Sequence, residues 1–342
     1  FDTISQHYKQ PAEEFTDSQP DALPTAEEVQ FRTLQLKDQF MESESFVLLQ
    51  NELSKPIVVE SSVDQPVERH NPLFHFCILS CRTLTNITRN PYLLASHWIV
   101  SILIALFCGL LFWHATDDMA GVQNRLGCLF FTCAFFAFSS MTSLEFFSTE
   151  KAIFLRERAS GFYGPFAFYL SKVLFDIFPL RIVPPLLYGS IIYRMVGFFG
   201  NWVNFSKFLF ALVMFNLSSS AICLFIGISI EHLSVGNLTA SIFILISMLF
   251  GGFLMNKETM LPVLKWVKYL SIFNYAYEAM IVNELVHVVL RDRSMIDVRI
   301  PGSIILRQFG FDTSGYNFDL CMLTVIFAAV VVAGFVVLHV FI

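Results

Sequence analysis

The sequence predicts an all-α membrane protein that crosses the bilayer six times. Of its 342 residues, 55% are hydrophobic and only 15% are charged, which is far from the composition of a soluble domain. A helix needs about 20 predominantly apolar residues to cross the hydrocarbon core of a bilayer. Six stretches approach that length: 92–113, 126–147, 178–198, 208–230, 238–255 and 320–342.

Four of these stretches, the first, fourth, fifth and sixth, contain no charged residue. The second is uncharged until Glu145, near its end. The third is less regular, because it contains three prolines as well as Arg181 and Arg194. A membrane helix tolerates such prolines when neighbouring helices satisfy the carbonyl groups that they leave free. We therefore predict six spans.

The connections between the spans predict the orientation. The loop 148–160 carries three basic residues, whereas the loop 114–124 carries acidic charge and Arg125 only follows it. The positive-inside rule then predicts that 148–160 is cytoplasmic and, with six spans, that both termini are cytoplasmic; the basic residues of the long last loop favour the opposite orientation, but the rule governs loops of about 60 residues only weakly. The longest connection is 256–319, and its apolar part, 261–290, has a helical pattern that is expected to fold back onto the membrane surface.

The first 70 residues differ from the rest. They hold 14 of the 28 acidic residues and only 5 of the 22 basic ones, a composition that predicts a solvated cytosolic linker and offers nothing to nucleic acid. The seven cysteines have no spacing that suits zinc or a disulfide framework, and small buried hydrophobes are the expected role. The eight histidines are dispersed, so no metal site is expected.

The sequence also lacks the motifs of nucleotide chemistry. A phosphate-binding loop would need G-x-x-x-x-G-K-[ST], and no such string is present. Neither G-x-G-x-x-G nor H-E-x-x-H occurs. We expect no catalytic residue in this chain.

Several motifs resemble a known family. The run Gly121-Val-Gln-Asn-Arg-Leu-Gly, then Glu145-Phe-Phe and Arg156-Glu-Arg, and later Phe250-Gly-Gly-Phe-Leu-Met-Asn, resembles the membrane domain of the White or G subfamily of ABC transporters. The resemblance covers residues 71–342. It implies the fold of a type-2 ABC exporter membrane domain, with a re-entrant helical segment before the sixth span.

The resemblance also implies partners. Such a domain forms a homodimer or heterodimer with a second membrane domain, contacts membrane lipid and couples to nucleotide-binding domains that hold ATP and Mg²⁺. The string 10–15 is similar to the end of such a nucleotide-binding domain, so we expect that domain to precede this chain in the same polypeptide. The implied activity is export of amphipathic, lipid-like, sterol-like or xenobiotic molecules, and the membrane, plasma or internal, is left open.

Two stripes are candidates for a substrate path. Phe131, Phe135 and Phe138 share a helical face of the second span, and Leu245 and Met248 share one on the fifth. Helix packing or lipid contact is the commoner explanation of such stripes. The resemblance instead implies that they line the central cavity between two protomers, and that Phe253 and Leu254 form an apolar plug between that cavity and the exit.

Charged residues near the cytoplasmic side supply two further hypotheses. Glu145 and Arg181 are expected to pair in a polar relay, with Glu150 as an alternate partner for the arginine. The alternative, that Arg181 only extends its guanidinium to the lipid headgroups, stays open. The loop 150–160 and the helix 71–90 both flank spans on the cytoplasmic side, so we expect the ATPase domain to contact them, although the basic residues of the loop could simply set topology. The candidate residues of the loop are Lys151, Arg156, Glu157 and Arg158.

Two other functions are compatible with a polytopic membrane protein. The first is a channel or lipid scramblase that needs no nucleotide, although the uncharged spans offer no ring of charge for a selectivity filter. The second, a scaffold without transport activity, has the least support from the sequence.

Overall fold

The computed structural model describes residues 26–54, 72–89, 91–116, 118–198, 200–230, 232–255, 263, 265–286, 288–292 and 298–341. The chain divides into two units, Phe1–Pro66 and Val67–Ile342. Within the first unit, α2 (Ala26–Glu42) and α3 (Glu44–Ser54) meet at Ser43, whose hydroxyl donates to the carbonyl oxygen of Phe40 at 2.6 Å. The expected linker therefore contains two helices, while the string 10–15 lies outside the described residues.

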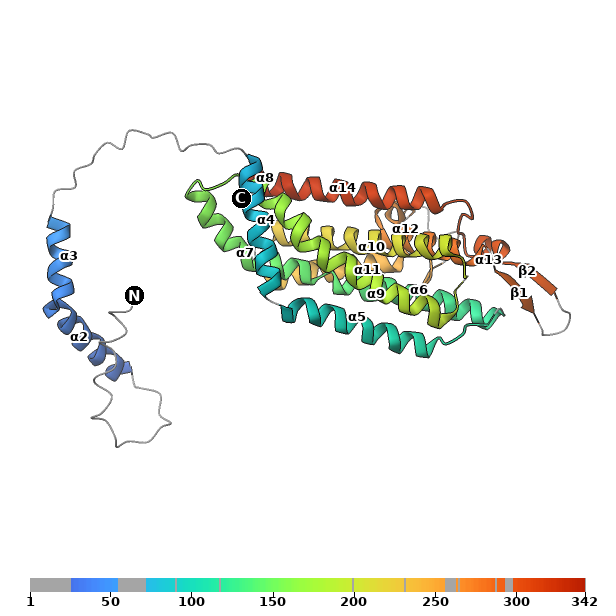
Figure 1. The fold of residues 1–342 in the computed structure, drawn as a ribbon, viewed down its shortest axis with the longest axis horizontal. Helices are drawn as coiled ribbons and strands as arrows, with labels where there is room; N and C mark the ends of the chain where they lie inside the picture. The colour runs from blue at the N-terminus through green and yellow to red at the C-terminus, as the bar shows by residue number, and fades with distance from the viewer. Residues whose placement is uncertain are drawn as a thin grey trace, which may run out of the picture. The chain divides into compact units, whose positions relative to one another are not determined.

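The second unit is a bundle of long helices that run along a common direction (Figure 1). A helix is present at each of the six predicted spans. These helices are α5 (Pro91–Leu111), α6 (Met119–Ser139), α9 (Phe178–Val196), α10 (Trp202–Ser229), α11 (Leu233–Leu249) and α14 (Tyr316–Phe341).

These six helices differ in length and in apolar composition. Among the described residues, four segments are long and apolar enough to cross a membrane: Leu94–Leu111, Met119–Ala159, Trp202–Ser229 and Tyr316–Val340. Helix α11 is apolar but shorter, with 17 residues. Helix α9 has Arg181, Arg194 and two internal prolines, which lower its apolar character. The protein is an integral membrane protein.

Helix α10 forms the centre of the bundle, where it contacts α14, α9, α12, α7, α6 and α11. All its residues from 211 to 224 are buried. Ser218 and Ser219 lie in this stretch, and the Ser219 hydroxyl is 2.6 Å from that of Ser140 at the end of α6. Small residues let neighbouring helices approach closely and bond across the interface.

The predicted loop 148–160 is helical, which corrects the expectation of a loop. Helix α7 (Thr142–Ala159) follows α6 after a short turn at Ser140 and Met141. The reason is local, because 142–159 contains no glycine or proline and many good helix formers. The segment Met119–Ala159 has 41 residues, or about 61 Å of helix, against a hydrocarbon core of about 30 Å. Since α6 alone is long enough to cross, α7 extends beyond the hydrocarbon core.

A second correction concerns the apolar segment 261–290, which was expected to lie on the membrane surface. The short 3₁₀-helix Val267–Leu270 is followed by α12 (Ile272–Leu285), every residue of which is buried. Helix α12 packs against α10, α14 and α6 inside the bundle. The Ser271 side chain fixes its start, since it accepts a hydrogen bond from Asn274 N at 3.2 Å and donates to the carbonyl oxygen of Ser247 at 2.7 Å.

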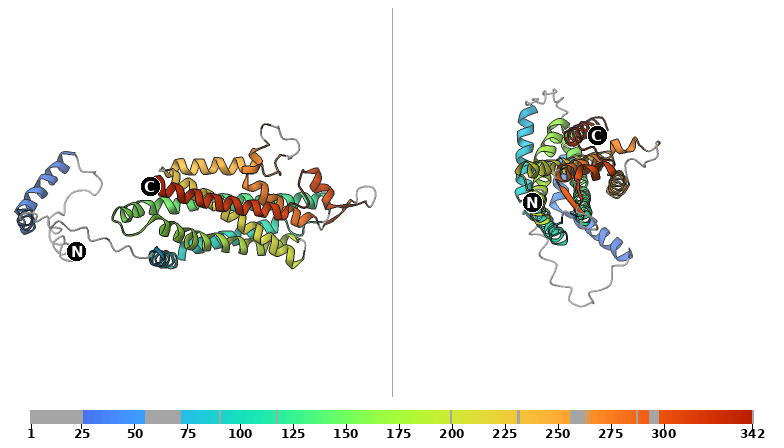
Figure 2. Two further views of the ribbon diagram at one scale, coloured as in Figure 1. Left: turned by 90° about the horizontal axis from the view of Figure 1, so that it is seen from above. Right: turned by 90° about the vertical axis from the view of Figure 1, so that its right-hand side faces the viewer.

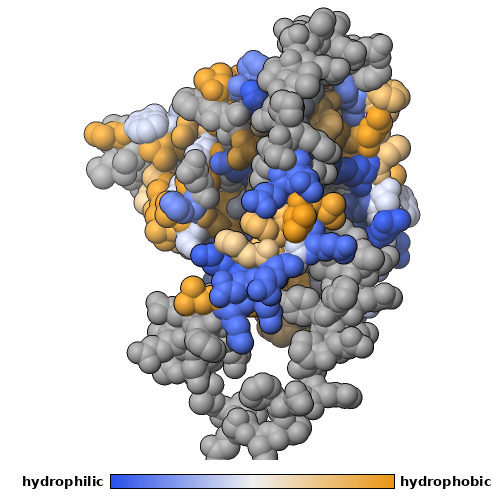
Figure 3. Space-filling view, turned by 90° about the vertical axis from the view of Figure 1, so that its left-hand side faces the viewer, coloured by the Kyte–Doolittle hydropathy of each residue, from blue (hydrophilic) through white to orange (hydrophobic). Residues whose placement is uncertain are grey.

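The remaining elements lie at the two ends of the bundle. At one end, a hairpin that the sequence did not predict joins β1 (Val289–Asp292) to β2 (Val298–Pro301), and α13 (Gly302–Gln308) follows it (Figure 1). At the other end lie α7, α8 (Pro165–Ser171), α4 (Pro72–Arg89) and the end of α14 (Figure 1). A π-helix, η1 (Lys172–Ile177), joins α8 to α9. Hydrophilic and hydrophobic side chains of the described residues are interspersed in the view of Figure 3.

The burial of the cysteines agrees only in part with the prediction. Cys108, Cys128, Cys133 and Cys223 are buried, in agreement with the role of small hydrophobes. The other three, Cys77, Cys81 and Cys321, are exposed, so the expectation of burial was wrong for them. The two on α4 are considered again below.

Candidate functional site: a groove and a polar cluster

The three phenylalanines of the predicted stripe on α6 line one groove. Phe131, Phe135 and Phe138 face residues of α5 across a cavity of about 570 Å³. The wall that α5 contributes consists of Ser96, His97 and Val100, so the groove is apolar with polar groups on one side. Phe135 is held by stacking on Tyr188 of α9, with ring centroids 5.7 Å apart.

The other predicted cavity residues, Leu245 and Met248, are on α11 and do not line this groove. Leu245 is 49% exposed, whereas Met248 packs against the core. A single chain therefore does not bring the two stripes together. That both face a shared cavity between protomers stays a prediction.

The predicted plug residues lie just beyond α11. The Phe253 ring stacks on Phe130 of α6, with ring centroids 4.7 Å apart, and meets the edge of Tyr277 of α12 at 6.1 Å. Leu254, its neighbour, is half exposed. Gly252 has a φ of +92°, a backbone conformation that glycine adopts without strain, and it turns the chain at the end of α11. The turn places Phe253 between α6 and α12.

Arg181 is fully buried, at 2% exposure, against the junction of α6 and α7. Its guanidinium donates to the carbonyl oxygen of Ser139 at 2.9 Å and to the Ser143 hydroxyl at 2.8 Å. The last carbonyl groups of a helix lack partners within the helix, so Arg181 satisfies a group that the end of α6 leaves free. The hypothesis that Arg181 only extends to the lipid headgroups is therefore wrong.

The other two members of the predicted polar relay, Glu150 and Glu145, have different surroundings. Glu150, the alternate partner of Arg181 in the prediction, forms an ion pair with Lys172 of η1 instead. Glu145 lies in the first turn of α7 with its side chain exposed. The pairing of Glu145 with Arg181 stays a prediction.

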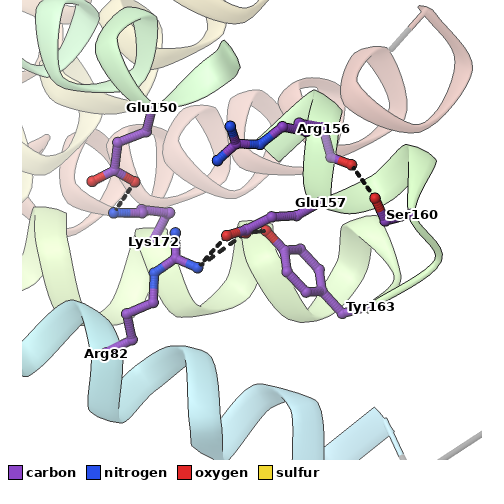
Figure 4. Close-up of polar contacts among 7 residues, drawn as sticks. All are labelled: Arg82, Glu150, Arg156, Glu157, Ser160, Tyr163 and Lys172. Carbon is purple, nitrogen blue, oxygen red and sulfur yellow. Dashed lines mark hydrogen bonds and ion pairs between the residues drawn. The ribbon is translucent and has the colours of Figure 1, made fainter. Parts of the chain in front are cut away.

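A polar cluster joins α4, α7 and the turn before α8 at one end of the bundle (Figure 4). Arg82 of α4 donates through one nitrogen to both carboxylate oxygens of Glu157, at 2.8 and 3.0 Å. The Tyr163 hydroxyl donates to Glu157 Oε2 at 2.5 Å. Glu157 thus holds two segments that are distant from each other in sequence.

The turn after α7 creates this arrangement. Gly161 N donates to the carbonyl oxygen of Arg158, and Phe162 N donates to that of Glu157, the double closure of a Schellman motif. The motif needs a left-handed residue after the helix, and Gly161 supplies it with a φ of +74°. The chain therefore reverses, and Tyr163 returns to the carboxylate of Glu157.

The charges of this cluster reinforce one another outside the hydrocarbon core. Burial by itself raises the pKa of Glu157, but the hydrogen bonds from Tyr163 and Arg82 outweigh it and lower the pKa overall. Burial and the hydrogen bond to Glu157 both raise the pKa of the Tyr163 hydroxyl. For Arg82, the attraction to Glu157 exceeds the effect of burial and raises the pKa. Glu157 is consequently ionised and Tyr163 is neutral at physiological pH.

The predicted coupling residues share α7 but have different surroundings. Glu157 is the centre of the cluster, and Arg158 makes a long 3.4 Å hydrogen bond to the carbonyl oxygen of Leu338, near the end of α14. Arg156 is exposed, and in Figure 4 its carbonyl oxygen accepts a hydrogen bond from the Ser160 hydroxyl at 3.0 Å. Lys151 is half-buried near the middle of the helix.

Sequence reasoning missed a buried ion pair. Arg125 of α6 and Glu284 of α12 meet at 2.7 Å, with side chains only 6% and 3% exposed. Arg125 also donates to the carbonyl oxygen of Ala115 at 3.1 Å, in the segment before α6. Arg125 had been placed just outside the second span, and Glu284 in a surface segment. An ionisable residue next to an apolar stretch was the available signal.

In the described ranges, no group of three or more His, Cys, Asp or Glu side chains is placed to hold a metal ion.

The long apolar helices and the charged groups buried among them define an integral membrane protein. Residues 75–285 match the family described as ABC-2 type transporter, and this chain belongs to that family. Its relatives identify it as a membrane domain of the ABCG type.

Three of these relatives show the extent of the similarity. A probable ATP-dependent permease of Saccharomyces cerevisiae is 33% identical over 92% of this chain and 31% of its own length. ABC transporter G family member 24 of Dictyostelium discoideum is 34% identical over 68% of this chain and 21% of its own length. The broad substrate specificity ATP-binding cassette transporter ABCG2 of Sus scrofa is 33% identical over 60% of this chain and 31% of its own length. The chain thus spans a third or less of these relatives.

Proposed function

We propose that this chain is the membrane-spanning part of an ATP-driven exporter. Its family supports this proposal, and so do the printed names of its relatives, an ATP-dependent permease and ATP-binding cassette transporters. A membrane domain of this family works with a nucleotide-binding domain. Since the sequence has no phosphate-binding loop, ATP and Mg²⁺ would bind to that other domain, which we place N-terminal in the same polypeptide.

The polar cluster supports the proposal that the nucleotide-binding domain contacts this end of the bundle. Helices α4 and α7 lie at the same end of the bundle, and the Arg82–Glu157 ion pair joins them directly (Figure 4). By the positive-inside rule, the basic residues Lys151, Arg156 and Arg158 support a cytoplasmic location for this end and for both termini. A nucleotide-binding domain that moves α7 would therefore also move α4, which is followed closely by α5.

The groove between α5 and α6 is the observation that carries the substrate assignment. Three phenylalanine rings offer flat apolar contacts, while Ser96, His97 and Ser139 offer polar ones. Such a mixture suits an amphipathic molecule, lipid-like, sterol-like or xenobiotic. Leu245 and Met248 of α11 would complete the cavity when a second membrane domain, identical or related, packs against this one.

The proposal is tested with Phe138→Ala in the intact transporter. Phe138 is 41% exposed in the groove, so its removal should leave the fold and the abundance intact. Export and substrate-stimulated ATP hydrolysis should both fall several-fold in proteoliposomes. The matched control is Phe210→Ala, a phenylalanine of α10 that is 51% exposed and does not line the groove.

Two results would contradict the proposal. If Phe138→Ala leaves export and stimulation unchanged for every substrate of the wild type, the groove does not bind substrate. If purified wild type moves lipid or solute equally well without ATP, the protein is a channel or scramblase rather than an exporter.

A further inference from the structure

Helix α4 has two different faces. One face, with Phe76, Leu79 and Thr83, packs against α8 and η1. The opposite face of its first three turns is exposed and apolar. It consists of Leu73, Phe74, Ile78 and Leu84, which are 68%, 55%, 51% and 47% exposed, together with Cys77 and Cys81.

Membrane lipid is the occupant that fits this face. Only one residue separates α4 from α5, and α5 exposes Leu103, Phe107 and Leu110, at 59%, 64% and 65%, to the acyl chains around the bundle. Helix α4 runs across the ends of the spans, at the edge of the bundle (Figures 1 and 2). Its exposed apolar face therefore continues the lipid-facing surface of α5 at the level of the headgroups.

The two cysteines occupy the centre of this face. Cys77 and Cys81 are four residues apart, one helical turn, so their thiols project from the same side of α4. Both are exposed, whereas the four cysteines of α5, α6 and α10 are buried. Arg89 in the last turn of α4 is also exposed and suits the anionic cytoplasmic leaflet.

We propose that Cys77 and Cys81 are S-acylation sites that carry long-chain fatty acyl groups inserted in the inner leaflet. Amphipathic helices next to a membrane span are substrates of this modification. The donor is a long-chain acyl-CoA, and a membrane acyltransferase supplies the catalysis. The cysteine sulfur attacks the acyl carbonyl, a new C–S thioester bond forms, the C–S bond to coenzyme A breaks, and the cysteine proton ends on the released coenzyme A thiol.

The modification has a consequence for the polar cluster. Arg82 follows Cys81 directly and holds Glu157 from the edge of the same helix. Two acyl chains would anchor α4 in the leaflet while α7 moves with the ATPase domain. The acyl groups would thus hold α4 in the leaflet while the motion of α7 reaches it through the Arg82–Glu157 contact.

The experiment uses the full-length transporter expressed in eukaryotic cells. Free thiols are blocked under denaturing conditions, thioesters are cleaved with hydroxylamine, and each released thiol receives a maleimide-polyethylene glycol mass tag. Relative to wild type, Cys77→Ser and Cys81→Ser should each lose one hydroxylamine-dependent tag, and the double variant should lose two. Cys321→Ser is the matched control, because Cys321 is exposed at the start of α14, the opposite end of the bundle, and its replacement should not change the number of tags.

The proposal is overturned if wild type shows no hydroxylamine-dependent tag, or if the double variant shows as many as wild type. If the double variant does not reach the membrane, mass spectrometry of the wild-type peptide that contains 77 and 81 decides the matter, because unmodified thiols there refute it. The inference rests on the cytoplasmic orientation proposed above. Labelling of Cys77 and Cys81 by an impermeant maleimide on intact cells would show that the orientation itself is wrong.

Discussion

At the scale of single residues, the Arg125–Glu284 ion pair is a buried contact whose stability depends on both partners. Both side chains are almost fully buried, and removal of a charge from water is costly unless its partner and further hydrogen bonds replace the hydration. Arg125 has such a second contact at the carbonyl oxygen of Ala115. The pair therefore ties α12 to α6 and to the segment that precedes α6.

Loss of either partner alone should destabilise the protein strongly. Arg125→Ala or Glu284→Ala leaves one uncompensated buried charge, a defect of about 3–5 kcal/mol. We expect a large loss of folded protein in detergent, measured by thermal unfolding monitored with size-exclusion chromatography. The double variant Arg125→Leu/Glu284→Leu should be more stable than either single alanine variant. Arg194→Ala, an exposed arginine of α9, is the control, and equal losses in all variants would refute a specific pair.

At the scale of elements, the link between α4 and α7 depends on one partly exposed ion pair. The Arg82 side chain is 46% exposed and that of Glu157 is 22% exposed. Such pairs contribute little to stability, so their importance is in the geometry that they fix. The Gly161 turn adds Tyr163 to the same carboxylate and thereby makes α4, α7 and the start of α8 a connected unit.

Glu157→Gln and Arg82→Ala should uncouple ATP hydrolysis from transport without loss of abundance. The number of substrate molecules exported per ATP should fall several-fold in proteoliposomes, while basal hydrolysis continues. The charge exchange Arg82→Glu/Glu157→Arg should restore part of the coupling. Arg89→Ala, which changes an exposed arginine on the same helix, should behave as wild type. Unchanged coupling in Glu157→Gln would show that this pair does not transmit motion.

The pH dependence of this link follows from the lowered pKa of Glu157. The contribution of its carboxylate is complete above the pKa of an unfolded glutamate, about 4.3, and is lost as the pH falls through the lower pKa of the folded state. Coupling in the wild type should therefore stay constant between neutral and mildly acidic pH. A coupling ratio that changes near neutral pH and loses this change in Glu157→Gln would contradict the assignment.

At the scale of the whole molecule, Phe253 lies where three parts of the bundle meet. It follows α11 and contacts Phe130 of α6 and Tyr277 of α12, while the groove lies farther along α6, toward the cluster. A ring in this position separates the two ends of the transport path if the plug prediction is right.

Phe253→Ala should therefore raise basal ATP hydrolysis and passive leak of substrate by several-fold. The physical reason is the loss of a stacked aromatic ring between α6 and α12, which opens a route past the plug. Leak is measured as efflux of preloaded substrate from proteoliposomes without ATP. Val263→Ala, which changes an exposed side chain of the following segment, is the control. If Phe253→Ala raises neither the passive leak of substrate nor basal ATP hydrolysis, the plug assignment is wrong.

The sequence by itself determined the membrane class, the approximate positions of the long apolar helices and the face that Phe131, Phe135 and Phe138 share. These properties depend on local composition and on helical periodicity, which act within one segment. The three phenylalanines of α6 line one groove for the same reason, since side chains on one helical face meet the same neighbouring helix, α5.

Only the tertiary structure decided which distant residues meet. Arg125 and Glu284 are 159 positions apart, and Arg82 and Glu157 are 75 apart, so no periodicity connects them. Arg181 satisfies a helix end that exists only because α6 stops at Ser139, 42 positions before it in the sequence. The apolar helical pattern of 261–290 predicted a segment on the membrane surface, whereas every residue of α12 is buried in the bundle. The bundle buries it because its charged groups, Glu278 and Glu284, find partners there, the backbone N–H of Asp312 and the guanidinium of Arg125.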